Sequence, residues 1–221
     1  MPKIVDHEQR RGEIALALWQ VIHEQGIDGV SFRAVAEAAG VSIGRVQHYF
    51  TSKDELVVFG CRAMVSAAEQ DHGPDPSPRG PARARDELAD FLCAPLPLTE
   101  GLRVGSSVWA TYLAKSVSHP GVAAVVAEAM QGRVEVTATL LAAARGTQEV
   151  RGTREAREAR GDEQPAPDVE VAPETARVQS TALALASLSE GLSSRILAGA
   201  LDAVEAGALI RDAVDRAVHT D

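Results

Sequence analysis

Eight residues between Ser42 and Tyr49 carry many of the side chains that could recognise another molecule by hydrogen bonding. The segment reads Ser-Ile-Gly-Arg-Val-Gln-His-Tyr, and Lys53 follows four residues later. A guanidinium such as Arg45 can donate to O6 and N7 of guanine, and a carboxamide such as Gln47 can pair with N6 and N7 of adenine. These residue types therefore indicate non-covalent reading of base edges, with a lysine nearby for phosphate.

The sequence offers little for covalent or metal chemistry. It contains no His-Glu-x-x-His pair, no glycine-rich phosphate loop and no nucleophile elbow. Its six histidines are scattered, and Cys61 and Cys93 lie in apolar helical surroundings that are typical of buried thiols. We therefore expect no enzyme activity, no cofactor and no metal site, and an all-helical enzyme is the weakest of three hypotheses.

Short helices joined by tight turns are expected to position the polar segment. Ser31 is a candidate N-cap for the helix FRAVAEAAG, Gly40 is its candidate C-cap, and Ser42 is a candidate N-cap for the next helix. A Gly-Val-Ser turn between two short helices is typical of a helix-turn-helix unit, which we expect at 33–52. The two helices would present the residues that follow Ser42 on one surface.

Capping residues and glycine also mark the limits of the helices before and after this unit. Asp6 is a candidate N-cap for a first helix that ends at Gly26, with Trp19 in its core face. Ser52 and Glu55 have the spacing of a capping box, so a fourth helix begins directly after the recognition segment. A helix-turn-helix domain at 1–54 follows from these limits.

The remaining chain also favours helices. Ala, Leu, Glu, Arg and Val dominate it, and apolar residues recur at helical spacing between the prolines. We therefore predict an all-α protein whose second domain, 55–221, is helical and has a mobile segment at about 146–170, where charge is dense. The last two helices are rich in small apolar residues. Their apolar faces could lie in an intramolecular core, but contact with a second copy is the favoured alternative.

The charge balance limits the possible partners. The formal net charge is −9, and the first 55 residues carry six basic and eight acidic side chains. Such a balance argues against nonspecific nucleic-acid binding, although a local patch can still bind. The start of the sequence has no signal peptide pattern, and no apolar run is long enough to cross a membrane. A cytoplasmic protein without a membrane partner is expected.

The segment from Arg10 to Leu56 resembles the N-terminal domain of the TetR family of transcriptional regulators. The last two helices, with the sequence ALASLSEGLSSRIL, more distantly resemble the C-terminal half of choline-responsive repressors. The residues that carry the first resemblance are Ile14, Ala17, Gly26, Ser31, Val35, Ala36, Ala39, Gly40, Val41, Ser42, Gly44, Val46, Phe50, Ser52, Lys53 and Leu56.

The resemblance implies a homodimer that binds a pseudo-palindromic, double-stranded DNA operator and represses transcription. It implies that Arg33 reaches a base or a phosphate, that Ile43 and Arg45 face base edges, and that Tyr49 and Lys53 hold phosphates. Gln47 departs from the family, which usually has an aromatic residue at that position. From motif and resemblance together, the expected DNA-binding residues are Ser31, Arg33, Ser42, Ile43, Gly44, Arg45, Gln47, His48, Tyr49 and Lys53.

A small-molecule effector would act through the second domain. Its binding would move the fourth helix and spoil the match between the two recognition helices and the operator. We expect a mainly apolar effector, because no inward-pointing charge cluster is evident in the sequence. Trp109 and Tyr112 share a helix face, and such an aromatic pair belongs more often to the core than to a pocket. The expected lining residues are Met64, Phe91, Trp109, Tyr112 and Met130.

The remaining hypothesis is a helical adaptor that binds another protein and never contacts DNA. The acidic balance of the first 55 residues slightly favours it. Replacing Arg45 and Lys53 by alanine would leave the activity of such an adaptor intact.

Overall fold

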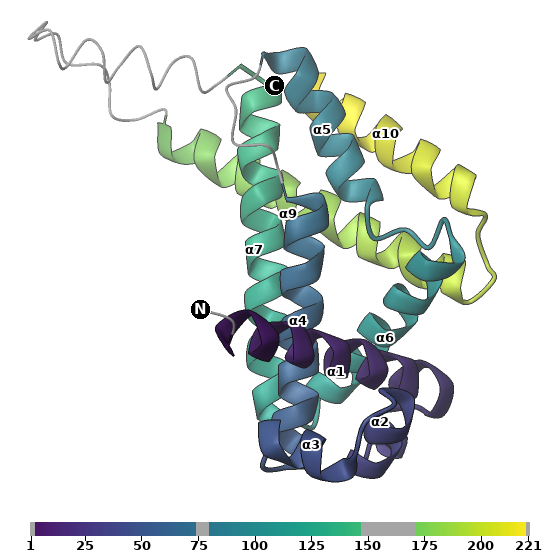
Figure 1. Cartoon of the computed structure of the whole chain (residues 1–221). Helices are drawn as coiled ribbons and strands as arrows, with labels where there is room; N and C mark the ends of the chain where they lie inside the picture. The colour runs from purple at the N-terminus through teal and green to yellow at the C-terminus, as the bar shows by residue number, and fades with distance from the viewer. Residues whose placement is uncertain (1–2, 74–79, 147–170, 220–221) are drawn as a thin grey trace, which may run out of the picture. The chain divides into compact units, whose positions relative to one another are not determined.

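The protein is described by a computed structural model that covers residues 3–73, 80–146 and 171–219, and every regular element in these ranges is helical (Figure 1). The predicted all-α fold is therefore confirmed. Residues 147–170 of the predicted mobile segment lie outside the described residues. The elements are α1 (Lys3–Gln25), the 3-10 helix η1 (Ile27–Gly29), α2 (Phe32–Ala38), α3 (Ile43–Tyr49), α4 (Lys53–His72), α5 (Pro81–Cys93), α6 (Glu100–Ser116), α7 (Pro120–Ala144), α9 (Val171–Leu197) and α10 (Ala203–His219).

The chain packs into two compact units. Unit 1 consists of Met1–Gly73 and Thr99–Met130, and unit 2 consists of Pro74–Leu98 and Gln131–Asp221. The first part of α7 thus belongs to unit 1 and its second part to unit 2. The domain boundary expected between residues 54 and 55 falls inside α4, in the middle of unit 1, and it stays a prediction about function.

The core of unit 1 forms where α1 crosses α4 and α6. Leu18 and Ile22 of α1 are fully buried, at the helical spacing visible in the sequence. The indole of Trp19 is half-buried, and its Nε1–H donates to the carbonyl oxygen of Gly60 at 3.0 Å. Gly60 itself lies deep in α4, where a methyl group would come within 2.7 Å of the hydroxyl oxygen of Tyr112. This close approach of α4 to α1 and α6 needs a residue without a side chain.

The first helix begins earlier than expected. α1 starts at Lys3, so Asp6 lies within the helix and does not cap it. The physical reason is that no glycine or proline stands between Lys3 and Gly12, so the sequence contains no residue that breaks the helix in this stretch.

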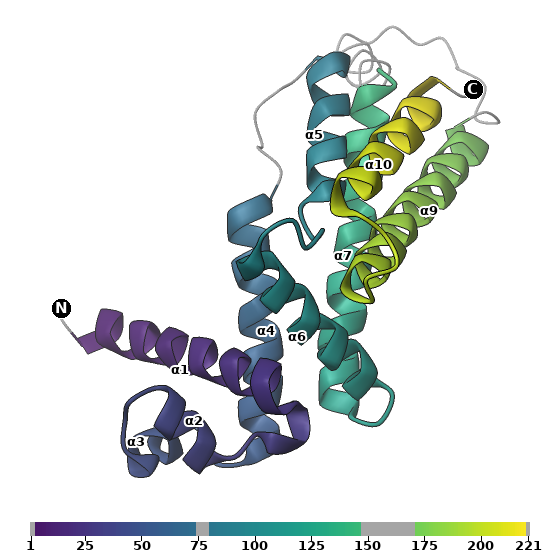
Figure 2. The same ribbon diagram turned by 90° about the vertical axis from the view of Figure 1, so that its right-hand side faces the viewer.

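Unit 2 is a bundle of α5, α9, α10 and the second part of α7 (Figure 2). Its core is built mainly from leucine, isoleucine, valine and alanine side chains of all four helices, among them the fully buried Leu88, Leu92, Leu140 and Leu141. The turn between α9 and α10 is closed by backbone bonds from Gly199 and Ala200. The carboxylate of Asp202 then accepts from two amides at the start of α10.

Membrane insertion finds no support in the described helices. Not one of them combines the length and the apolar character that crossing a bilayer requires.

Candidate nucleic-acid interface

The polar face of the interface begins at the corner between α1 and α2. η1 follows α1, and the backbone then becomes extended at Ser31. The side-chain oxygen of Ser31 accepts a hydrogen bond from the amide of Ala34 at 3.1 Å. Ser31 is therefore the N-cap of α2, as its sequence position predicts, and its hydroxyl oxygen is already engaged.

The turn between α2 and α3 has the hydrogen bonds of a Schellman motif. The amide of Val41 donates to the carbonyl of Ala36 at 2.9 Å, and the amide of Gly40 donates to the carbonyl of Glu37 at 3.1 Å. Gly40 has a φ angle of +64°, which side chains with a Cβ atom rarely adopt. This glycine ends α2 and sets the angle at which α3 leaves it.

α3 presents nearly all of its side chains outward. Ser42 caps it by accepting from the amide of Arg45 at 3.3 Å, and Val46 is the one buried residue among its seven described residues. Ile43, Arg45 and Gln47 are exposed, as are Gly44 and His48. A helix this short buries one anchor and leaves two turns of surface for a partner.

Gly44 has a distinct environment within this helix. A Cβ atom at Gly44 would have no described atom within 4 Å, and its φ angle is not positive. The fold itself therefore does not need glycine here, in contrast to Gly40. A glycine at an exposed helix position is consistent with a requirement for close approach by an outside partner.

Aromatic residues fix the end of α3. Phe50, the C-cap residue, is fully buried and packs against Phe59 with ring centroids 4.9 Å apart. The guanidinium of Arg11 lies over both rings, 4.5 Å from the centroid of Phe59. Tyr49 is half-buried against the same core, and its ring meets His48 edge-on at 5.3 Å. Sequence reasoning missed Arg11, because its position on α1 gives no sign of the rings beneath it.

Lys53 stands at the first turn of α4 and connects two parts of the interface. Its ammonium donates to the backbone carbonyl of Asp28 in η1 at 3.1 Å, and the side chain is exposed. One of its three N–H groups is thereby used, and two can still donate to a phosphate. Lys53 consequently joins the start of α4 to the corner that precedes α2.

The first turn of α4 is closed by its own side chains. Ser52 accepts from the amide of Glu55 at 3.1 Å. The carboxylate of Glu55 accepts from the amide and from the hydroxyl of Thr51, both at 2.7 Å. These two bonds, the backbone one first, lower the pKa of Glu55. The predicted capping box is thus present, except that the reciprocal bond goes to Thr51, which sequence reasoning did not include.

The interface is not basic as a whole. Between residues 28 and 55 the chain carries three basic side chains and four acidic ones. Arg33 and Arg45 are exposed, and neither forms an ion pair with a described residue. Affinity for an anionic partner would therefore depend on individually placed groups more than on bulk charge.

Two histidines connect the interface helices to α6 and α7 within unit 1. His23 of α1 is hydrogen-bonded through Nδ1 to the hydroxyl of Ser107 at 2.8 Å. His119, just before α7, accepts at Nδ1 from the amide of Val122 at 3.2 Å, and its Nε2 lies 3.7 Å from the carboxylate of Asp54. The start of α4 is therefore in polar contact with the turn between α6 and α7.

Four of the five residues expected to line an effector pocket divide between the two cores. Met64, Trp109 and Tyr112 belong to the core of unit 1, where Tyr112 is fully buried and its hydroxyl has no described partner. Met130 is exposed and Phe91 packs against the core of unit 2. The structure thus brings three of the five into one core, and the pocket stays a prediction.

Sequence reasoning also missed an inward-pointing charge in unit 2. The guanidinium of Arg133 in α7 donates to the carbonyl of Phe91 and to the hydroxyl of Ser189, at 3.3 and 3.2 Å. It also lies 4.8 Å from the ring centroid of Phe91. Burial lowers the pKa of Arg133 and raises that of Glu190, and the two charges oppose these shifts in each other. Arg133 therefore ties α5, α7 and α9 together.

Metal-binding groups were not expected, and the described residues contain no cluster of three or more His, Cys, Asp or Glu side chains that could hold an ion.

Comparison with known proteins identifies what this arrangement resembles. Residues 14–58 match the model of the family described as bacterial regulatory proteins, tetR family. The chain is 36% identical over 114 residues to the HTH-type transcriptional regulator PksA of Bacillus subtilis, covering 52% of this chain and 55% of that protein. It is 28% identical over 130 residues to the HTH-type transcriptional regulator BetI of Stenotrophomonas maltophilia, covering 56% and 62%. The chain thus spans little more than half the length of these relatives.

Most of the chain also resembles solved structures. A putative transcriptional regulator from Saccharomonospora viridis, in complex with choline, superimposes with a TM-score of 0.71 at 18% identity, over 94% of this chain and 96% of that one. This likeness shows a common fold that extends beyond the segment matched by the family model.

Proposed function

The chain belongs to the TetR family of bacterial regulatory proteins, and on that premise we propose that it is a ligand-responsive regulator that binds a specific DNA operator. The observation that carries the proposal is the outward polar face of α3, which Ser42 caps and Val46 anchors. The relatives that the chain matches are named as transcriptional regulators and not as enzymes, which agrees with the absence of catalytic motifs from the sequence. Such a regulator would work in the cytoplasm.

The exposed side chains of α3 suit the major groove. Arg45 would donate to O6 and N7 of guanine, Gln47 would pair with adenine, and Ile43 would contact a thymine methyl group. Arg33 at the start of α2 would reach a base or a phosphate. The ammonium of Lys53 and the hydroxyl of Tyr49 would bind phosphates and so fix the register of the helix on the duplex.

Two copies of this interface would act together. On α9, Leu183 is 56% exposed, and α10 exposes Val204 and Leu209 as well. Small residues lie exposed beside Leu183 at helical spacing, namely Ala184, Ser187 and Gly191. A pair of such faces would bury this mainly apolar surface in a C2 dimer, in which small residues let the helices approach closely. Its two α3 helices would then read half-sites one helical turn apart, about 34 Å.

An effector would release the operator if it bound the DNA-incompetent state more tightly than the DNA-bound state. The choline complex of the structural neighbour supports the idea that this fold accommodates a small molecule. We propose a mainly apolar effector and repression as the mode of control. The contacts of His23 and His119 would carry a shift of α6 or α7 to α1 and α4, and thereby to the interface.

The first experiment is fluorescence anisotropy of the purified protein on DNA that flanks its own gene, repeated over a series of salt concentrations. A saturable, sequence-preferring signal with a steep salt dependence is expected. The Arg45→Ala variant should lose about 1–3 kcal/mol and relax the preference at one base position. The Lys53→Ala variant should weaken binding to all sequences and lower the salt slope by about one.

A matched control is available on the same helix. Arg62 is exposed on α4, nine residues beyond Lys53 and therefore about 13 Å further along the helix axis. Arg62→Ala removes the same charge and should leave the salt slope unchanged. If neither flanking DNA nor a selected random DNA pool showed sequence preference, the proposal would be wrong.

The acidic balance of residues 28–55 favours one alternative, a helical adaptor that binds protein. The same variants distinguish the two functions, because an adaptor would keep its activity when Arg45 and Lys53 are both replaced by alanine.

A further inference from the structure

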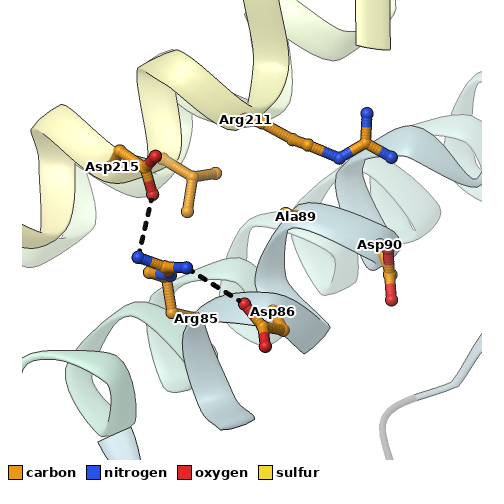
Figure 3. Close-up of a pocket in the computed structure, with 7 residues that line it drawn as sticks. Arg85, Asp86, Ala89, Asp90, Arg211 and Asp215 are labelled. Carbon is orange, nitrogen blue, oxygen red and sulfur yellow. Dashed lines mark hydrogen bonds and ion pairs between the residues drawn. The ribbon is translucent and has the colours of Figure 1, made fainter. Parts of the chain in front are cut away.

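A hollow of about 320 Å³ opens between α5 and α10 in unit 2 (Figure 3). Sites for small molecules begin at roughly this volume, about 300 Å³. The hollow is built within one unit and uses none of the residues assigned above to DNA or to the effector. Its lining residues are Arg85, Asp86, Ala89 and Asp90 of α5, and Arg211, Val214 and Asp215 of α10.

The hollow has an apolar floor and a charged rim. Ala89 and Val214 are buried, with exposed fractions of 8% and 1%, because they also belong to the core between the two helices. The other five lining residues are charged. This lining is more charged than that of a usual small-molecule site, so a ligand would have to bind mainly through its own charges.

On one side of the hollow the charges are already paired. Arg85 Nη1 lies 3.5 Å from the carboxylate of Asp215, and Arg85 Nη2 lies 3.4 Å from that of Asp86. Figure 3 shows these two pairs as dashed lines that converge on Arg85. The guanidinium of Arg85 is therefore already paired with two carboxylates and is less able to bind a charged group of an incoming molecule.

On the other side two opposite charges remain. Figure 3 shows Arg211 of α10 and Asp90 of α5 on the side of Ala89 that faces away from the Arg85 pairs. In the part of the chain that the structure describes, neither side chain forms an ion pair, and both are exposed. Both act on the neighbouring Cys93: burial raises the pKa of this thiol, Arg211 opposes the rise, and Asp90 adds to it.

The charge arithmetic selects one class of ligand. Asp86 and Asp215 are already paired with Arg85, so a simple anion would meet Arg211 but would face Asp90, and a simple cation would meet Asp90 but would face Arg211. A molecule that carries both a carboxylate and an ammonium group satisfies both unpaired side chains at once. We propose that the hollow between α5 and α10 binds a small zwitterion of the amino-acid type, with its carboxylate on Arg211 and its ammonium on Asp90.

The site is distinct from the proposed effector pocket and does not depend on DNA binding. Because both charges are exposed and solvent screens them, each contact contributes little. The dissociation constant should therefore be no lower than about 1 mM, and binding should weaken as salt is added.

The experiment is a calorimetric titration of the full chain, without DNA, with ω-amino acids of increasing length: glycine, 4-aminobutyrate and 6-aminohexanoate. Butyrate and butylammonium serve as single-charge probes. At least one zwitterion should bind saturably and at least fivefold more tightly than either single-charge probe. Arg211→Gln and Asp90→Asn should each remove that preference.

Two further variants test whether binding depends specifically on the charges of Arg211 and Asp90. Arg216→Gln removes an exposed cation of α10 that does not line the hollow, so it should leave binding unchanged. The exchange variant, Arg211→Asp with Asp90→Arg, should restore binding, because a zwitterion can bind in the reverse direction. Circular dichroism of each variant establishes that it is folded. The proposal is overturned if no zwitterion binds, if butyrate binds equally well, or if Arg211→Gln has no larger effect than Arg216→Gln.

Discussion

Two glycines in the helix-turn-helix illustrate how differently one residue type can be constrained. Gly40 adopts a φ of +64°, whereas Gly44 has open space around it and no positive φ. Gly40→Ala should therefore destabilise the fold by more than about 1 kcal/mol. Gly44→Ala should stabilise α3 by up to about 1 kcal/mol, because alanine is the better helix former. Urea unfolding measures both values.

The same pair of variants separates folding from recognition. If α3 approaches the major groove closely at Gly44, Gly44→Ala should lower the affinity for operator DNA even though it stabilises the protein. A Gly44→Ala variant with unchanged affinity would show that the DNA does not approach at this position.

The hydroxyl of Tyr112 is buried without a described partner, which makes it an unfavourable feature of the core. Tyr112→Phe should therefore stabilise the protein by about 1 kcal/mol at neutral pH. Burial raises the pKa of Tyr112 above its ordinary value of 10.0, so the folded state keeps the proton while the unfolded state loses it. Stability of the natural protein should thus fall as the pH rises above about 10.

Phenylalanine cannot ionise, so the advantage of Tyr112→Phe should grow above pH 10. The free energies of unfolding of both proteins at pH 7 and pH 10.5 measure this difference. A gain that stays constant between the two pH values would mean that the hydroxyl is not desolvated in the fold.

At the residue scale, sequence reasoning succeeded where the constraint is local. Ser31, Gly40 and Ser42 all act as predicted, because a cap depends on residues within three or four positions along the chain. It failed where the partner is distant: the contact of Arg11 with Phe59 joins two helices, as does that of Arg133 with Ser189. No periodicity within one helix contains that information.

At the scale of the element, the stability of α3 depends strongly on its ends, because the helix has only seven residues. Ser42→Ala removes the bond to the amide of Arg45 and should cost about 1 kcal/mol. Thr99→Ala removes an equivalent cap from α6, where Thr99 accepts from the amide of Leu102 at 3.2 Å. Both variants should therefore lower the free energy of unfolding by similar amounts.

The two cap variants should differ in their effects on DNA binding. Ser42→Ala should weaken operator binding because it frays the recognition helix, whereas Thr99→Ala should leave operator affinity nearly unchanged under conditions where both proteins are folded. Anisotropy on the same operator provides the measurement. Equal losses of affinity would mean that global stability, and not the order of α3, controls binding.

The limits of helices were also predictable in most cases, since glycine, proline and capping residues mark them. α5 ends before Pro95, and α7 begins at Pro120. The start of α1 was the exception, because the helix begins at Lys3, directly after Pro2, and not at the predicted cap Asp6. What the sequence could not supply is how the helices combine: α7 contributes to both compact units, and four of the five expected pocket residues divide between two cores.

At the scale of the whole molecule, the proposed dimer can be tested through α9. Leu183 is 56% exposed on the face proposed to meet a second copy. Leu183→Glu would place a charge in that interface and should raise the dimer dissociation constant at least tenfold, since an unpaired charge is costly to bury. Leu16, which is 63% exposed on α1, offers a matched control, because Leu16→Glu should leave the dimer intact. Sedimentation velocity over a range of concentrations measures both.

The distribution of aromatic residues gives this protein a built-in optical signal. Its two tryptophans, Trp19 and Trp109, and its two tyrosines, Tyr49 and Tyr112, all fall in unit 1. The indole of Trp19 is hydrogen-bonded to α4, the helix that starts just after α3. Tryptophan and tyrosine fluorescence therefore reports on unit 1 alone, and a non-absorbing compound bound in unit 2 becomes visible only if its effect travels to the helices of unit 1.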